Sequence, residues 1–129
     1  MQRPEIDQQV TFLYARDLAE TAVFYRDLLC LPLVLDQGSC QIFGVTDTAF
    51  IGFCRHIDPP ASSDYVILTL VSARVEEWHQ YLQQHGVPIE KPPTFYEKFN
   101  ITHLFIRDPN GYLVEIQTFH DPVWPAVGG

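Results

Sequence analysis

The first half of the chain alternates short β-favouring runs with one amphipathic stretch. Residues 8–15 favour a strand, and Asp17 follows them as a side-chain acceptor three positions before Glu20. This spacing predicts a helix that begins at Leu18. Apolar side chains four positions apart then give this helix a face that packs on a sheet, and Pro32 ends it. Turn-like residues separate the three extended segments that we expect next, at residues 33–36, 40–45 and 49–54.

The second half repeats this order after a linker rich in proline and serine at residues 56–64. Residues 65–71 form an apolar, β-branched run that predicts a strand. A second amphipathic helix follows, marked by Val75, Trp78 and Leu82 and closed by Gly86. Three further strands are expected at residues 87–90, 100–107 and 112–119. Residues 91–99 contain Pro92-Pro93 and three aromatic side chains, which fits either a loop over a cavity mouth or a plain crossover.

The last two strands form the most strongly predicted hairpin. They are joined by Asp108-Pro109-Asn110-Gly111, where proline presets the turn and glycine accepts a positive φ. Alternation divides the hairpin into a helix-facing set, Leu104, Ile106, Val114 and Ile116, and an opposite set, His103, Phe105, Glu115 and Gln117. The mixed aromatic and polar character of the second set is typical of a small-molecule pocket.

The repeated order predicts a single α+β domain over residues 1–129, built from two tandem βαβββ modules. Module one covers about residues 8–56, the linker about 57–64, and module two about 65–120. Neither module can cover its sheet alone, so we expect the modules to form a curved mixed sheet around a cavity.

Composition narrows the classes of partner. The 129 residues are 47% hydrophobic, which excludes intrinsic disorder, and carry a formal charge of −8, which argues against nucleic acid and anionic membranes as partners. Three cysteines without a Cys-x-x-Cys pair suggest neither a disulfide scaffold nor a zinc knuckle. No apolar run is long enough for a signal peptide or a membrane span, so we expect a cytoplasmic protein.

Three motifs together carry a family resemblance that spans residues 10–119. Arg16-Asp17-Leu18, Phe24-Tyr25-Arg26-Asp27-Leu28-Leu29 and Asp108-Pro109-Asn110-Gly111-Tyr112-Leu113-Val114-Glu115-Ile116 resemble the vicinal oxygen chelate superfamily. This superfamily includes glyoxalase I, bleomycin resistance proteins, fosfomycin resistance enzymes and extradiol dioxygenases. The resemblance implies the glyoxalase-like fold and a homodimer, but one fold hosts several chemistries here.

The resemblance also implies where a divalent metal would be held, namely by His, Gln or Glu on four cavity-facing strands. The first three positions correspond to Val10, to the neighbourhood of Gly52 and to residues 65–67, and none offers a strong ligand. Only Glu115 is retained, and one carboxylate does not hold a metal by itself. His103 shares the expected cavity face, so a partial two-residue site remains an alternative.

These residues lead to two competing functional hypotheses. The first is a bleomycin-resistance-like protein that binds a small aromatic or cationic organic molecule in an apolar cavity, with no cofactor, metal ligand or catalytic residue. The ligand-binding residues would be Phe12, Tyr14, Tyr65, His103, Phe105, Glu115 and Gln117. The alternative is a divalent-metal-dependent glyoxalase-like lyase or isomerase, or an extradiol-dioxygenase-like enzyme, that uses Glu115 and His103. An accessory subunit without a ligand is a third option.

The role of Glu115 also has two interpretations. His103 or Gln117 could simply provide the hydrogen bonds that a buried Glu115 carboxylate needs. Alternatively, a His103–Glu115 pair could act as a general base.

Overall fold

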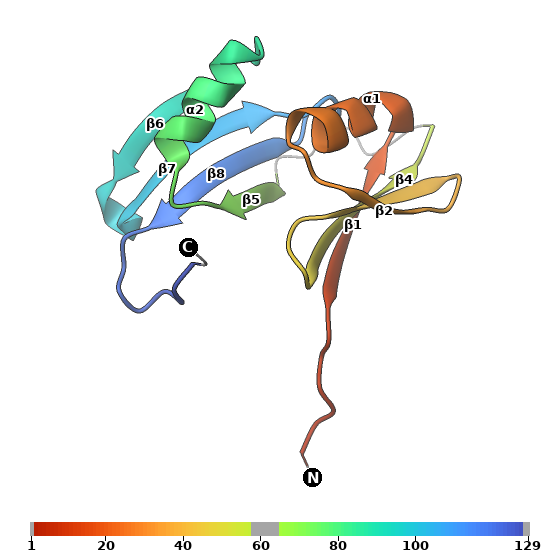
Figure 1. The fold of residues 1–129 in the computed structure, drawn as a ribbon, viewed down its shortest axis with the longest axis horizontal. Helices are drawn as coiled ribbons and strands as arrows, with labels where there is room; N and C mark the ends of the chain where they lie inside the picture. The colour runs from red at the N-terminus through yellow and green to blue at the C-terminus, as the bar shows by residue number, and fades with distance from the viewer. Residues whose placement is uncertain (1, 58–64, 128–129) are drawn as a thin grey trace. The chain divides into compact units, whose positions relative to one another are not determined.

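Each half of the chain folds into a four-stranded mixed sheet with helical structure on one face, as the computed structural model shows for residues 2–57 and 65–127 (Figure 1). The chain divides into two compact units, Met1–Ala61 and Ser62–Gly129. The strand orders are β1-β4-β3-β2 and β5-β8-β7-β6, and in each unit the first strand pairs in parallel with the last. The predicted duplication of a βαβββ module is therefore confirmed.

The elements of unit 1 match the predicted segments closely. They are β1 (Gln9–Ala15), α1 (Leu18–Ala22), the π-helical η1 (Val23–Leu28), β2 (Leu33–Asp36), β3 (Cys40–Gly44) and β4 (Ala49–Arg55). The helix begins at Leu18 as predicted, because the Asp17 carboxylate accepts a hydrogen bond from the Glu20 backbone N–H at 3.1 Å. The helix widens into a π-helical segment that the sequence pattern did not predict.

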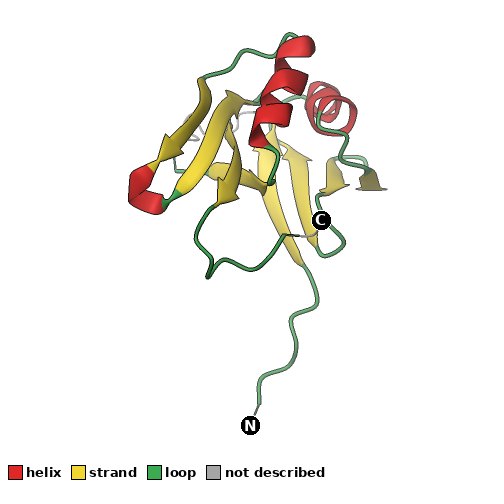
Figure 2. Ribbon diagram, turned by 60° about the vertical axis from the view of Figure 1, so that its left-hand side comes forward, coloured by secondary structure: helices red, strands yellow, loops and turns green. Residues whose placement is uncertain are grey.

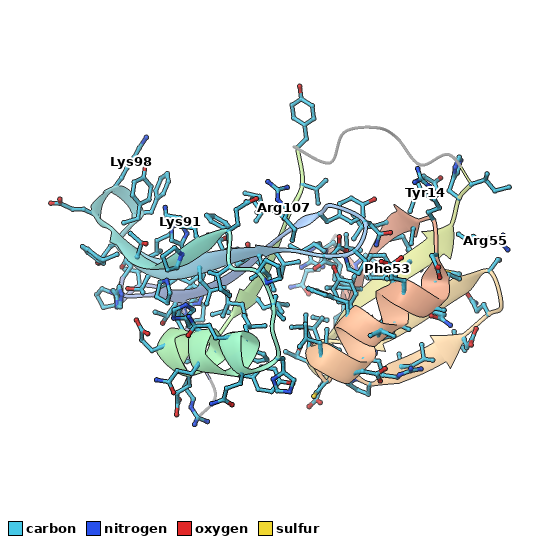
Figure 3. All side chains as sticks on the ribbon, turned by 90° about the horizontal axis from the view of Figure 1, so that it is seen from above. Tyr14, Phe53, Arg55, Lys91, Lys98 and Arg107 are labelled. Atoms are coloured by element: carbon cyan, nitrogen blue, oxygen red, sulfur yellow. The ribbon has the colours of Figure 1, made fainter. Side chains whose placement is uncertain are left out.

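The two faces of the first sheet differ in burial. The aromatic core residue Tyr25 packs on Phe53 with ring centroids 4.6 Å apart, and both rings are almost fully buried. Figure 3 shows Phe53 on the side of the sheet that carries α1, whereas Tyr14 projects to the opposite side. Val10, Phe12 and Tyr14 alternate onto that opposite side and are 38%, 53% and 48% exposed. We call this side the open face of unit 1.

Unit 2 contains a longer helix over its sheet. Its elements are β5 (Ile67–Val71), α2 (Val75–Gln84), β6 (Lys91–Tyr96), the 3-10 turn η2 (Glu97–Phe99), β7 (Ile101–Arg107) and β8 (Leu113–Phe119). α2 lies across one face of the sheet and packs against β6, β7 and β8 (Figure 2). The predicted helix-facing set is fully buried there, with Leu104, Ile106, Val114 and Ile116 all at 0% exposure.

The predicted chain reversals in unit 2 are also present. Gly86 has a φ of +70° at the end of α2, and the Val87 N–H returns to the Leu82 carbonyl oxygen at 3.0 Å. Gly111 has a φ of +88° in the β7–β8 turn. The buried Asp108 carboxylate accepts the N–H groups of Asn110 and Tyr112 in this turn, at 2.9 and 2.8 Å. Both reversals follow from glycine's tolerance of the left-handed region.

The strand predicted at residues 87–90 is wrong, and so are both non-strand interpretations of residues 91–99. The extended segment is β6, Lys91–Tyr96, which pairs antiparallel with β7. The two prolines do not prevent this pairing, because β6 is an edge strand and its register shifts between Lys91 and Thr94. Consequently the Lys91 side chain belongs to the sheet surface and not to a mobile loop.

Two further sequence predictions concern the linker and membrane-spanning segments. Residues 58–64 of the predicted linker lie outside the described residues. Within residues 2–57 and 65–127, no helix is long and apolar enough to cross a membrane.

Candidate ligand site

The candidate site lies on the face of the second sheet that points away from α2. Four of the predicted residues meet there: His103 and Phe105 from β7, and Glu115 and Gln117 from β8. The register pairs Phe105 with Glu115, and His103 with Gln117. β5 lies on the other side of β8 and places Thr69 directly beside Glu115. Strand alternation therefore brings polar side chains from three strands to one spot.

Glu115 is the buried centre of a hydrogen-bond network. One carboxylate oxygen accepts the Thr69 hydroxyl at 2.7 Å, and the other accepts His103 Nδ1 at 2.6 Å. With its amide nitrogen turned toward the carboxylate, Gln117 donates to both oxygens, at 3.2 and 2.8 Å. Glu115, His103 and Gln117 are only 8%, 5% and 7% exposed. Every acceptor direction of the carboxylate thus has a donor, as a buried charge requires.

Lys91 fixes the tautomer of His103. The Lys91 ammonium lies 3.3 Å from His103 Nε2 and can only donate, so Nε2 is the acceptor. Nδ1 then carries the proton that is donated to Glu115. The order Lys91, His103, Glu115 is therefore a directional chain of hydrogen bonds that begins on β6.

Aromatic rings form the walls above this polar floor. The cavity has a volume of about 610 Å³, within the ~300 to 1,000 Å³ of small-molecule sites. Its lining includes the rings of Tyr96, Phe99, Phe105, Phe119 and Trp124. Two pairs of rings are nearly parallel: Phe119 with Trp124, at 3.9 Å between centroids and 20°, and Tyr96 with His103, at 6.2 Å and 4°. The site is a half-open hollow with a polar floor and largely aromatic walls.

The donor set of this site does not fit the divalent metal that the resemblance implies. Both oxygens of Glu115 already accept hydrogen bonds, and His103 Nε2 faces an ammonium group, which repels a cation. Val10 and Gly52 supply no donor atom at two of the other expected positions. Across residues 2–57 and 65–127, no group of three or more His, Cys, Asp or Glu side chains is arranged to hold a metal.

Three predicted ligand-binding residues are not among the residues that line the cavity of unit 2. Phe12 and Tyr14 belong to the open face of unit 1, with Tyr14 against the His56 ring at 4.8 Å between centroids. Tyr65 precedes β5, is 97% exposed and is not part of the cavity lining. A ligand-binding role for these three remains a prediction.

Sequence reasoning missed Thr69, Lys91 and Trp124. Thr69 could have been predicted from the duplicated topology, because parallel pairing of the first and last strands of the unit places it beside Glu115. Lys91 was hidden by the non-strand interpretation of residues 91–99. Trp124 follows the last strand, where no periodicity places a side chain.

Comparison with known proteins adds to this geometry. The sequence model of the Glyoxalase/Bleomycin resistance protein/Dioxygenase superfamily matches residues 8–116, which is most of the chain. The chain belongs to this superfamily. No match was found among curated protein sequences. Membership agrees with the tandem βαβββ topology, whereas the chemistry varies between superfamily members.

Solved structures confirm the glyoxalase-like fold. A lactoylglutathione lyase from Agrobacterium tumefaciens aligns with a TM-score of 0.72 and 23% identity, covering 90% of this chain and 96% of that protein. A glyoxalase/bleomycin resistance protein/dioxygenase from Nocardioides aligns with a TM-score of 0.75 and 17% identity, covering 100% and 92%. Another protein of the same description, from Alicyclobacillus acidocaldarius, gives 0.72 and 19%, covering 94% and 96%. At these identities the likeness establishes the fold alone.

Proposed function

We propose that this superfamily member binds a small, flat aromatic molecule in the cavity of unit 2 without using a metal ion. The observation that carries the proposal is the combination of aromatic walls with a polar floor whose hydrogen bonds are already satisfied. A site of this kind recognises its ligand through ring contacts and shape, with few polar groups to orient it.

The walls support a flat ligand. The Phe119–Trp124 pair and the Tyr96–His103 pair each present near-parallel rings to the cavity region. Trp124 is 45% exposed, so part of its ring surface is available for stacking. Offset stacking of one further ring contributes about 0.5 to 1.5 kcal/mol beyond the burial of its area.

The charges around the cavity favour an acidic group on the ligand over a cationic one. Glu115 has no unused acceptor direction, so it does not attract a cation as a bare carboxylate would. The Lys91 ammonium lies 5.8 Å from the ring centroids of both Tyr96 and Phe105, beside the cavity walls. An ammonium group with unused N–H donors orients a carboxylate or phenolate.

The affinity of a naphthalene probe for the wild type and for two variants tests the proposal. We expect 2-naphthoate to bind the full chain with a Kd on the order of 0.1 to 1 mM, detected by calorimetry and by a change in tryptophan fluorescence. Phe105→Ala weakens binding about tenfold, because one wall of the cavity is lost. Phe95→Ala is the matched aromatic control and leaves the affinity unchanged, since Phe95 is exposed and lies outside the lining.

The charge preference is tested with 2-naphthylmethylammonium, which has the same ring system and the opposite charge. We expect it to bind more weakly than 2-naphthoate to the wild type, and Lys91→Met to reduce or reverse this difference. Equal loss of both probes in Phe105→Ala and Phe95→Ala would refute binding in the cavity. A preference for the ammonium probe would refute only the proposed acidic group on the ligand and would leave binding in the cavity intact.

The metal-free part of the proposal has its own test. Protein purified without chelators is analysed for Ni²⁺, Mn²⁺, Fe²⁺ and Zn²⁺, and its thermal shift is measured with each ion. Substoichiometric metal and no shift beyond that of Glu115→Ala are expected. Stoichiometric metal that disappears in Glu115→Ala would replace this proposal with the metal-dependent enzyme.

A further inference from the structure

Two cysteines face each other across the β3–β4 hairpin of unit 1. Cys40 and Cys54 are direct register partners on antiparallel strands, and both are free thiols. Their sulfur atoms are 2.7 Å apart, against ~2.05 Å in a disulfide bond. Sequence spacing gave no sign of this proximity, because fourteen positions separate the two residues.

The backbone pairing at this point suits a covalent bridge. The Arg55 N–H donates to the Ser39 carbonyl oxygen at 2.8 Å, so the next pair along, Cys40 with Cys54, is a non-hydrogen-bonded pair. In such pairs the Cα atoms are ~4.5 Å apart, which lies inside the ~4.4 to 6.8 Å range that disulfides span. Little backbone movement is needed to join the sulfur atoms.

We propose that Cys40 and Cys54 form a reversible intramolecular disulfide and are a thiol-modification site of this protein. The two thiols differ in access: Cys40 is buried, at 7% exposure, and Cys54 is half-buried. Burial, together with the hydrogen bond to Cys54, raises the pKa of the Cys40 thiol to about 11. Cys54 is therefore the attacking sulfur and Cys40 the resolving one.

The reaction needs a small-molecule disulfide as oxidant. Cys54 loses its proton to solvent and attacks one sulfur of that disulfide, whose S–S bond breaks and releases a thiolate. Cys40 then loses its proton and attacks the Cys54 sulfur of the mixed disulfide, releasing the second thiolate. The released thiolates take up protons. Two protein thiols are oxidised and one small disulfide is reduced to two thiols.

The bridge would link Cys40, the first residue of β3, to Cys54, the last but one residue of β4. Cys54 also pairs in register with Tyr14 of β1, so the bond lies beside the exposed aromatic side chains of the open face. Closing a loop of this length restricts the unfolded chain and raises the melting temperature by several degrees where the native geometry accepts the bond.

The test treats the full chain with oxidised glutathione and then counts thiols under denaturing conditions. The third cysteine, Cys30, is exposed and has a φ of 59°, so the experiment is run in parallel on Cys30→Asn, since asparagine tolerates this conformation. In Cys30→Asn the thiol titre is expected to fall from two to zero with no bound glutathione, whereas in the wild type the exposed Cys30 can also form a mixed disulfide with glutathione. Peptide mapping should link Cys40 to Cys54, and dithiothreitol should restore both thiols.

Two controls make the result decisive. Cys54→Ser should form no intramolecular bridge and show no rise in melting temperature on oxidation. A mixed disulfide with glutathione that persists on Cys54 of the wild type would overturn the proposal. A bridge that forms only after unfolding, or that lowers the melting temperature, would show that the native hairpin does not accept the bond and would equally overturn it.

Discussion

Replacing Glu115 by glutamine tests whether the chain Lys91, His103, Glu115 is directional. The carboxamide is almost the same size as the carboxylate, but one of its two polar atoms is a donor. His103 Nδ1–H then meets either a carbonyl oxygen, which leaves Thr69 or Gln117 without its full acceptor, or an NH₂ group. His103 cannot escape by changing tautomer, because Nε2–H would then face the Lys91 ammonium.

The expected loss follows from these contacts. Each buried donor left without a partner costs about 1 to 3 kcal/mol, and the network is under 10% exposed at Glu115, His103 and Gln117. We expect Glu115→Gln to lower the free energy of unfolding by about 2 to 3 kcal/mol. Lys91→Met alone should cost under about 1 kcal/mol, because its ammonium is only partly buried.

The double variant distinguishes a directional chain from simple packing. When Lys91→Met is added to Glu115→Gln, His103 becomes free to change tautomer and to accept from the new amide. The double variant should therefore be more stable than the sum of the single losses predicts, by about 1 to 2 kcal/mol. Urea unfolding followed by circular dichroism measures all four proteins. Glu90→Gln is the matched control: it breaks the exposed Arg107–Glu90 ion pair and should cost under about 1 kcal/mol. Losses that add within about 0.5 kcal/mol would refute the assigned tautomer.

Three further predictions concern other parts of the fold. A Cβ at Gly52 would lie 2.5 Å from the Phe12 ring, so Gly52→Ala should lower the free energy of unfolding in urea by about 1 to 3 kcal/mol. In a Phe12→Ala protein, the same substitution should cost much less. Equal costs in the wild type and in Phe12→Ala would contradict this prediction. Because the folded state raises the pKa of Cys40 from 9.0 to about 11, the folded chain holds this proton while the unfolded chain loses it. The free energy of unfolding should thus fall between pH 9 and 11 more steeply in the wild type than in Cys40→Val, and parallel pH profiles would exclude this cause. Asp108→Ala removes the acceptor of two backbone N–H groups in the β7–β8 turn. It should therefore lower the melting temperature in a thermal scan, by an amount equivalent to about 1 to 2 kcal/mol. Asp108→Asn should lower the melting temperature by less.

The parts of the fold that sequence predicted correctly depend on local signals. Asp17 and Glu20 mark a helix start through a contact three residues apart, and Gly111 marks a turn through its own φ. The helix-facing and opposite sets of the last hairpin follow from alternation alone. These signals were sufficient for the duplicated topology, because each of them acts within one element.

The signals that failed were those where two rules conflict. Pro92 and Pro93 argue against a strand, yet an edge strand needs only part of its N–H groups for pairing, and β6 pairs with β7 around the two prolines.

Contacts between separate strands depend on register and could not be predicted either. Examples are the contact between Lys91 and His103 and the contact between Thr69 and Glu115. The same holds for Cys40 and Cys54. Alternation indicates the face on which a side chain lies, but register decides which side chain it meets.

The structural and the functional interpretations of Glu115 are compatible once the network is known. A carboxylate with every acceptor direction occupied stabilises the sheet, and under the proposed function it leaves the cavity floor without a free acceptor for a cation. Selection of a ligand then falls to the walls, where Phe105 and Trp124 present ring surface. Floor and wall should therefore separate experimentally. Glu115→Gln should change stability more than affinity for 2-naphthoate, and Phe105→Ala should do the reverse. If both variants lost affinity and stability in the same proportion, the floor would be part of the recognition surface and the division of roles between floor and walls would be wrong.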